Sequence, residues 1–293
     1  MDFATLLQPL LLSLAAASLY AAVASGLTLE FGVVKIVNFA HGDFVMLGAF
    51  VTYFLATRYG ISPALGMFIA ALLMGALSAL VYYGFLARIL KQDQHNQLLA
   101  TLGLSILIVN TAAILWTPDA RALHVPEILP TLHLGRVTIP GNNLFVALVG
   151  VCLYLALLYV LNYSRWGTLM RLASDDPELA TYSGLDVNKA FALAFIIGGF
   201  SAGIAGGLVS LVLYVQPLVG IDLGIRAFAI IALGGLGSVP GAMIGAVVLS
   251  IVEGIVNAFV PGGGSWGYGI AFVVLIAVFL VRPYGLFGKE LRS

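Results

Sequence analysis

Long apolar runs, each close to the length needed to cross a lipid bilayer, dominate this sequence. They cover residues 9–29, 64–86, 98–116, 142–163, 190–214, 239–258 and 267–282. About 20 consecutive apolar residues in helical form span the hydrocarbon core of a membrane. A helix is suited to that solvent because it satisfies its backbone hydrogen bonds within one segment. The sequence therefore predicts an all-α polytopic membrane protein.

The charged residues are too few to cover the surface of a soluble protein. Only 9% of the 293 residues are charged, whereas 61% are hydrophobic. Lys and Arg are scattered in ones and twos and the formal net charge is zero, so no patch that could neutralise a phosphate backbone is present. We therefore expect a single transmembrane domain over residues 1–293, in contact with membrane lipid and not with nucleic acid.

Two shorter apolar stretches, 43–57 and 223–234, each adjoin a polar break that contains glycine. The first break runs from Asn38 to Asp43 and the second from Gly234 to Ser238. Such breaks are typical of discontinuous helices, in which freed backbone groups face a solute path near the middle of the membrane. The sequence thus predicts about eight transmembrane helices, with short discontinuous helices near 38–57 and 223–238.

The positions of Lys and Arg predict the orientation in the membrane. Every second loop lies on one side of the membrane, and one of these two sets of loops carries most of the Lys and Arg residues. They are Arg88, Lys91, Arg165, Arg171, Lys189, Arg282, Lys289 and Arg292. The positive-inside rule places these loops in the cytoplasm. The C-terminus is then cytoplasmic and residues 1–8 lie outside. Residues 117–141, which are rich in proline and too polar to span, form the main periplasmic loop.

The longest cytoplasmic connection, residues 165–189, contains a helix signal of its own. Ser174 or Asp175 is placed to cap a helix, Pro177 to begin it and Gly184 to end it. A short helix with acidic residues in its first turn offers more surface than a simple connection needs. We expect this helix to dock another protein, with an ordinary interfacial helix as the alternative.

Several polar side chains lie in or beside predicted membrane segments, where an unpaired polar group is costly. The candidates for a translocation path or gate are Asn38, His41, Asp43, Gly237, Ser238 and Glu253. An alternative for the first cluster is structural: His41 bonds a carbonyl at the helix break and Asp43 caps the helix that follows. For Glu253, a functional and a structural role stay equally open.

The sequence offers little support for an enzyme or a metal site. All four histidines precede the Gly237-Ser238 segment, so the order of serine then histidine of an intramembrane serine protease is absent, and no His/Glu metal spacing occurs. The single cysteine, Cys152, cannot form a disulfide within the chain. No phosphate-binding Gly-x-x-x-x-Gly-Lys-Ser/Thr segment exists. We expect this chain to bind no cofactor, so any ATP that drives it binds another chain.

Three segments together resemble the permeases of branched-chain amino-acid ABC importers. They are Val37 to Ala49, Ala232 to Ala242 and Arg282 to Gly288, and the first is characteristic of the H-type subunit of the Liv system. The resemblance extends from the first helix to the C-terminus. It implies a permease domain over residues 1–293 in a bacterial inner membrane. Such a permease moves leucine, isoleucine, valine or related small polar solutes by alternating access.

The same resemblance implies partners. These are a second, M-type permease, two subunits that bind ATP and Mg, and a solute-binding protein outside the membrane. In such permeases a cytoplasmic helix fits a groove on the ATP-binding subunit, which implies a docking role here for Arg171, Asp175, Asp176, Glu178, Ala180 and Gly184.

The resemblance leaves the solute and the energy source of transport open. Related permeases carry urea, amides, other amino acids or aromatic acids, so the exact solute is not determined. The alternative function is an ion-coupled secondary transporter or channel that acts without ATPase subunits. Asp43 and Glu253 would then be the coupling carboxylates.

Overall fold

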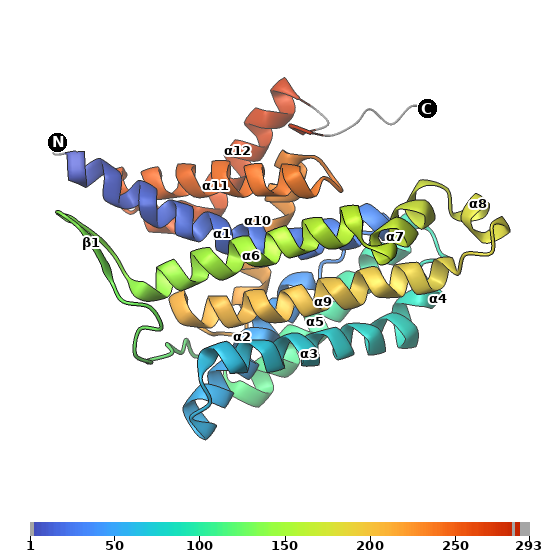
Figure 1. Ribbon diagram of the computed structural model, residues 1–293, viewed down its shortest axis with the longest axis horizontal. Helices are drawn as coiled ribbons and strands as arrows, with labels where there is room; N and C mark the ends of the chain where they lie inside the picture. Colours follow the sequence, from blue (N-terminus) through green and yellow to red (C-terminus); the bar gives the residue numbers. More distant parts are fainter. Residues whose placement is uncertain (1–2, 283–284, 288–293) are drawn as a thin grey trace.

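The computed structural model describes residues 3–282 and 285–287, which form an elongated bundle of helices (Figure 1). The long helices are α1 (Phe3–Val34), α3 (Pro63–Val81), α5 (Gln94–Trp116), α6 (Gly141–Tyr163), α9 (Val187–Val212) and α11 (Val239–Phe259). The π-helical turn η1 (Tyr82–Leu86) and α4 (Ala87–Ile89) continue α3. Within the described residues, six helical segments are long and apolar enough to cross a membrane. The prediction of an all-α polytopic membrane protein is confirmed.

One of the remaining helices, α2 (His41–Tyr59), has 19 residues, as many as α3 alone, and the other five are shorter. The five are α7 (Arg165–Asp175), α8 (Pro177–Tyr182), α10 (Val219–Gly234), the 3-10 turn η2 (Gly263–Trp266) and α12 (Gly267–Val281). The short apolar stretches expected near 38–57 and 223–238 thus correspond to α2 and α10. Both predicted breaks are present: α2 begins at His41 after a non-helical linker, and α10 ends at Gly234.

Helices α1 and α9 form the centre of the bundle. Both are largely buried, and α9 packs against α2 and α3 while α1 contacts α6, α9, α10 and α11. Small residues on α9 permit this close packing. A Cβ atom at Gly206 would lie 2.2 Å from the Val45 carbonyl oxygen, and one at Gly203 would lie 2.5 Å from the Ala70 carbonyl oxygen. Close approach of backbones is how helices associate where the solvent is itself apolar.

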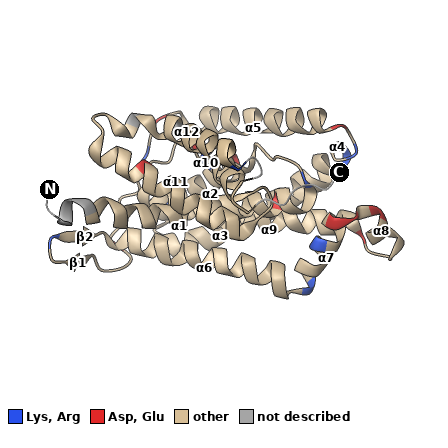
Figure 2. Ribbon diagram, turned by 90° about the horizontal axis from the view of Figure 1, so that it is seen from above, with Lys and Arg blue, Asp and Glu red and all other residues tan. Residues whose placement is uncertain are grey.

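The two long loops lie at opposite ends of the bundle (Figure 1). The loop of residues 117–141 contains a hairpin of β1 (Leu132–Leu134) and β2 (Val137–Ile139), and the Gln8 side chain joins Thr138 through two hydrogen bonds of 2.6 and 2.8 Å. The connection with α7 and α8 lies at the other end, where charged residues gather in Figure 2. The expected position of the C-terminus falls on residues 288–293, outside the described residues.

Arg121 connects the loop of residues 117–141 to the bundle. Its backbone forms an antiparallel bridge with Val215, with N–O distances of 3.0 and 2.8 Å. Its guanidinium lies over the rings of Phe50 and Phe54, at 5.8 and 5.9 Å from their centroids. Stacking of this kind attracts a cation to the aromatic face. The outer half of α2 and the link between α9 and α10 are thereby held together.

Candidate functional site

The break between α1 and α2 turns the chain back into the bundle. Helix α1 ends at Val34, next to Lys35 with a positive φ of 60°, and α2 begins at His41. The His41 Nε2 atom lies 3.1 Å from the carbonyl oxygen of Val23. Val23 precedes the end of α1 by about 16 Å, at 1.5 Å per helical residue. Helix α2 therefore begins deep inside the bundle and not at its surface.

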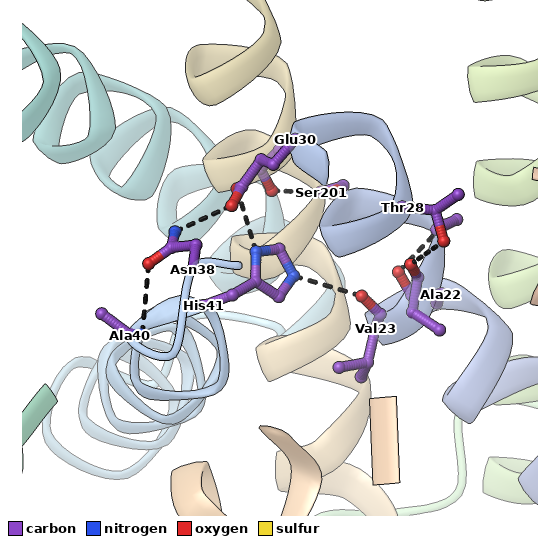
Figure 3. A network of polar contacts seen from close by, with 11 residues as sticks. Ala22, Val23, Thr28, Glu30, Asn38, Ala40, His41 and Ser201 are labelled. Atoms are coloured by element: carbon purple, nitrogen blue, oxygen red, sulfur yellow. Dashed lines mark hydrogen bonds and ion pairs between the residues drawn. The ribbon is translucent and has the colours of Figure 1, made fainter. Parts of the chain in front are cut away.

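A buried polar network stabilises this break (Figure 3). Glu30 on α1 accepts a hydrogen bond from Asn38 Nδ2 at 2.7 Å, and its other oxygen lies 2.9 Å from His41 Nδ1. The Ala40 amide donates to Asn38 Oδ1 at 3.1 Å. Glu30, Asn38 and His41 are 1%, 5% and 1% exposed. The linker and the start of α2 are thus bound to α1 through one carboxylate.

The geometry of His41 defines how many protons the network holds. Nε2 faces a carbonyl oxygen, which only accepts, so Nε2 carries a proton. Nδ1 faces a carboxylate oxygen at 2.9 Å, and two acceptors do not bind one another. A second proton therefore lies between His41 and Glu30. Whichever of the two carries it, the pair is neutral overall, which lowers the cost of burying it.

Helix α9 closes the network from the other side. A Cβ atom at Gly198 would lie 2.3 Å from Glu30 Oε1, so only glycine leaves room for the carboxylate. The Ser201 hydroxyl donates to the Gly198 carbonyl at 2.7 Å. The three helices α1, α2 and α9 therefore meet at Glu30.

Glu30 was not among the residues predicted from the sequence, because the predicted apolar run ended at residue 29 and α1 continues to Val34. An acidic residue at the edge of an apolar run reads as a helix boundary, although it is also the available signal for an intramembrane partner of Asn38 and His41. His41 contacts a carbonyl, as the structural alternative for this cluster expected, and its role in a solute path stays a prediction. The same alternative is wrong for Asp43: the N-cap of α2 is Ala40, and no side chain of the described residues caps this helix.

Asp43 is buried in the first turn of α2, and it is 1% exposed. Neither of its carboxylate oxygens has a hydrogen-bond partner within the described part of the chain. Beside it, α2 meets the start of α10, where a Cβ atom at Gly42 would lie 2.1 Å from the Gly220 carbonyl oxygen. The non-helical link 213–218 precedes α10, so a second re-entrant break lies here, and the sequence pattern did not predict it.

The predicted break at 234–238 lies against the end of α1. Gly235 and Gly237 adopt φ values of 101° and 82°, and the Ser238 hydroxyl accepts from the Gly241 amide at 3.1 Å to cap α11. Gly237 lies against Gly32 near the end of α1. With α7 this turn surrounds a cavity of about 260 Å³. Gly237 and Ser238 thus lie beside α7 and outside the His41 network.

Glu253 is paired. Its Oε1 accepts from Arg226 Nε at 3.0 Å and its Oε2 accepts from the Tyr20 hydroxyl at 2.9 Å. The three residues connect α11, α10 and α1, and the Glu253 side chain is 8% exposed. The structure therefore gives Glu253 a pairing role and does not bring it together with Asn38 or His41.

The connection of residues 165–189 forms two short helices where one was expected. Asp176 caps α8 by accepting from the Leu179 amide at 2.9 Å, and Pro177 is its first residue. The predicted cap, Ser174 or Asp175, is wrong because α7 continues through both residues. The Ser174 hydroxyl instead donates to the Gly32 carbonyl at 2.7 Å. Gly184 ends the segment with a φ of 81°.

The predicted docking residues are mostly on the surface of this connection. Arg171, Asp175, Asp176, Glu178 and Gly184 are exposed, whereas Ala180 is buried at 5%. Large apolar side chains accompany the charges: Leu179 is 62% exposed and Tyr182 is 86% exposed.

At the exit from this connection Asp186 caps α9. The Lys189 side chain and amide bind its carboxylate and hold the pKa of Asp186 below its usual value. The described residues include no group of three or more His, Cys, Asp or Glu side chains suited to a metal ion.

A multi-pass bundle with two re-entrant breaks and a buried polar centre defines the chain as a membrane transport protein of the permease class. The family described as branched-chain amino acid transport system, permease component, matches residues 10–279. The chain belongs to this family. It is a permease subunit of an ABC transporter and not an enzyme.

Two relatives and one solved structure illustrate the similarity. The high-affinity branched-chain amino acid permease LivH of Escherichia coli is 30% identical over 98% of this chain and 97% of its own. The corresponding permease BraD of Pseudomonas aeruginosa is 28% identical over 97% and 96%. The structure of PsaBC from Streptococcus pneumoniae in complex with Fab matches with a TM-score of 0.52 at 14% identity, over 98% and 95% of the two chains, and this likeness concerns the fold alone.

Proposed function

We propose that this chain carries leucine, isoleucine, valine or related small polar solutes across a bacterial inner membrane by alternating access. The observation that carries the proposal is the buried Glu30–Asn38–His41 network at the start of α2, in a chain of the branched-chain amino acid permease family. Such a network fixes an interrupted helix inside the bundle, where a solute path runs in transporters. The relatives LivH and BraD transport branched-chain amino acids by name, which supports the same solutes here.

The route proposed for the solute follows the break. Asn38, His41 and Asp43 lie where α2 and α10 begin beside each other, in the interior of the bundle. The first turn of a helix leaves backbone N–H groups without partners inside the helix. At the start of α2 the amides of His41, Asp43 and Phe44 donate instead to the carbonyls of Asn38 and Ala40 just outside the helix. Gly237 and Ser238 belong to the cytoplasmic end of this route, and the paired Glu253 braces it from α11.

Energy reaches the route through the cytoplasmic connection. We assign α7 and α8 as the surface that binds an ATP-binding subunit, which holds ATP and Mg. The exposed Leu179 and Tyr182 provide an apolar anchor, and Asp176 and Glu178 surround it with negative charge. Apolar anchors within a polar rim are the usual composition of an interface between proteins. The assembly would contain two such ATPases and a second, M-type permease.

The proposed assembly also contacts a solute-binding protein outside the membrane. The loop of residues 117–141, which contains the β1–β2 hairpin, lies at the opposite end from α7 and α8 and is the expected contact for a solute-binding protein (Figure 1). With α7 and α8 in the cytoplasm, this hairpin is periplasmic and the C-terminus is cytoplasmic. The excess of Lys and Arg on the cytoplasmic loops supports this orientation.

Co-purification tests the proposal. The chain is tagged, expressed in its native cell and extracted in mild detergent, and its partners are identified by mass spectrometry. We expect two ATPase chains and a second permease, and leucine uptake by the reconstituted complex that requires ATP and the binding protein. Uptake by the purified chain alone, without ATP, would refute the proposal and establish the ion-coupled alternative.

A further inference from the structure

We propose that the corner between α6 and α7 binds the headgroup of an anionic phospholipid, which holds α7 at the membrane surface. The α6–α7 corner consists of the end of α6 and the first turn of α7, with Tyr159, Tyr163, Ser164, Arg165 and Trp166. This inference goes beyond the proposed transport of solute. It uses the proposed orientation only to name the cytoplasmic leaflet as the source of the lipid.

The depth of the corner follows from the length of α6. This helix has 23 residues and is one of the helices long and apolar enough to cross a membrane. At 1.5 Å per residue it is about 34 Å long, slightly more than the hydrocarbon core of about 30 Å. Its last residue, Tyr163, and the first turn of α7 therefore lie at the level of the lipid headgroups.

Exposed side chains follow one side of α6 to the corner. Leu155, Tyr159 and Tyr163 are all exposed, at the spacing of one helix face. The rings of Tyr159 and Tyr163 are stacked with their centroids 5.7 Å apart, and the exposed Trp166 follows them. Tyr and Trp are enriched at the boundary between acyl chains and headgroups, because an apolar ring carries a polar end. This side of α6 therefore contacts an acyl chain, and the aromatic residues mark the boundary.

Close packing fixes the angle between α6 and α7. A Cβ atom at Gly167 would lie 2.2 Å from the Leu161 carbonyl oxygen, so glycine is needed for α7 to turn at this point. The Ser164 hydroxyl accepts from the Gly167 amide at 3.0 Å and caps α7. Small-molecule sites measure about 300–1,000 Å³, which a headgroup site resembles. The angle encloses a cavity of about 570 Å³, lined by Tyr163, Ser164, Arg165, Trp166 and Leu169.

Charge favours an anionic headgroup over a zwitterionic one. No Asp or Glu occurs from Gly141 to Ser174, and Arg165 has no ion-pair partner among the described residues. By contrast, Lys189 binds Asp186 at 3.0 Å. A guanidinium donates two parallel hydrogen bonds to a phosphate. The positive charge that Arg165 leaves uncompensated attracts a lipid with a net negative charge.

The corner is separate from the surface proposed to bind an ATP-binding subunit. The acidic residues Asp176 and Glu178 belong to α8 and its cap, and Figure 2 shows this acidic segment beyond the basic start of α7. Arg171 lines the other cavity, between α7 and the turn before α11. An ATP-binding subunit on α8 thus leaves the start of α7 to lipid. A soluble phosphate would bind the same guanidinium but gain nothing from the exposed side of α6, so lipid is the occupant to which we commit.

Lipid binding to the complete importer tests the site. The complex is delipidated in detergent and titrated with phosphatidylglycerol or phosphatidylcholine of the same acyl chains, and bound lipids are counted by native mass spectrometry. A basic residue near an anionic surface changes affinity roughly fivefold, so we expect Arg165→Gln to bind phosphatidylglycerol about fivefold more weakly than the wild type. Phosphatidylcholine should bind both equally. Lys91→Gln removes an exposed positive charge beside Asp93 and is the control, which should behave as the wild type.

Three outcomes would overturn the site. Equal affinity of the wild type and Arg165→Gln for phosphatidylglycerol means that the lipid does not bind through this residue. Displacement of the lipid by free glycerol phosphate at an equal concentration means that the cavity binds a soluble anion. Lipid bound by the chain alone but not by the complete importer means that an ATP-binding subunit covers the corner. None of these measurements needs solute uptake, so they are independent of the proposed transport function.

Amide hydrogen exchange tests whether the lipid holds α7. The complete importer is placed in nanodiscs of phosphatidylcholine with and without phosphatidylglycerol. We expect residues 165–175 of the wild type to exchange about fivefold more slowly with phosphatidylglycerol, following the same change in affinity, and those of Arg165→Gln to show no difference. Residues 177–182 of α8 are the internal control. Unchanged exchange of α7 in the wild type would contradict the proposal.

Discussion

The Ser174 hydroxyl donates a hydrogen bond of 2.7 Å to the carbonyl oxygen of Gly32, which lies 142 positions earlier in the chain. Gly32 in turn contacts Gly237, and Glu30 in the same turn of α1 binds Asn38 and His41. The end of α1 therefore connects α7 to the breaks at 35–40 and 235–238. We expect a displacement of α7 to act on the residues that hold the start of α2.

Removal of this hydrogen bond should weaken coupling. A side-chain hydrogen bond contributes about 1 kcal/mol, or roughly a factor of five in an equilibrium. We expect Ser174→Ala to lower uptake about fivefold while the ATPase still binds and hydrolyses ATP. Ser183→Ala, which loses a local bond to the Leu179 carbonyl at the exposed end of α8, is the control. Parallel loss of uptake and ATP hydrolysis would instead indicate failed docking.

The space at Gly198 should tolerate no side chain. A Cβ atom there meets Glu30 Oε1 at 2.3 Å, so Gly198→Val forces the carboxylate away from His41. We expect uptake to fall at least about tenfold and the thermal stability of the purified complex to decrease, because overpacking costs about 1–3 kcal/mol. Gly103→Val on α5 has no described atom within 4 Å of the new Cβ and should behave as wild type. Normal uptake by Gly198→Val would show that the network is dispensable.

The proton held between Glu30 and His41 can be examined by paired substitutions. Breaking a buried pair by removing one partner costs about 3–5 kcal/mol, so Glu30→Ala and His41→Ala should each destabilise the complex and abolish uptake. Glu30→Gln keeps Oε1 as an acceptor and should be milder. We expect the double variant Glu30→Gln, His41→Gln to be less damaging than the sum of the two single changes, as measured by thermal unfolding. Strict additivity would mean that the two side chains do not interact.

For His41 alone, uptake and membrane insertion are to be compared. His41→Ala should lower uptake more than it lowers the amount of inserted protein, because the helix break belongs to the solute route. Uptake normalised to the inserted protein, quantified by immunoblot, measures the difference. A proportional fall in both would leave His41 with a purely structural role.

Charge reversal on α8 should disrupt docking. Glu178 is exposed beside Leu179, and Glu178→Arg changes the sign of that surface without contact to the membrane helices. We expect loss of the ATP-binding subunits in pull-down, with normal insertion of the permease. Gly184→Trp should act similarly, since φ at this position is 81° and a large side chain would also be strained. Glu127→Arg in the loop of residues 117–141, at the opposite end of the bundle, is the control, and normal ATPase binding by Glu178→Arg would refute docking at α8.

The sequence was informative wherever a local rule applied. Apolar length located the membrane helices, because lipid leaves a backbone no other partner for its hydrogen bonds. Glycine and polar residues located the breaks near His41 and Ser238, and Pro177 and Gly184 located the ends of α8. The motif from Val37 to Ala49 was, with its two companion segments, sufficient to indicate the permease family.

The tertiary structure decided which distant groups meet. Glu30 at the edge of an apolar run, Gly198 on α9 and His41 on α2 come together only after the chain has turned back along α1, and no spacing in the sequence encodes that contact. The same holds for Ser174 with Gly32, and for Glu253 with Arg226 and Tyr20. The physical reason is that burial in lipid fixes each helix locally, whereas partners for buried polar groups are chosen by packing between helices.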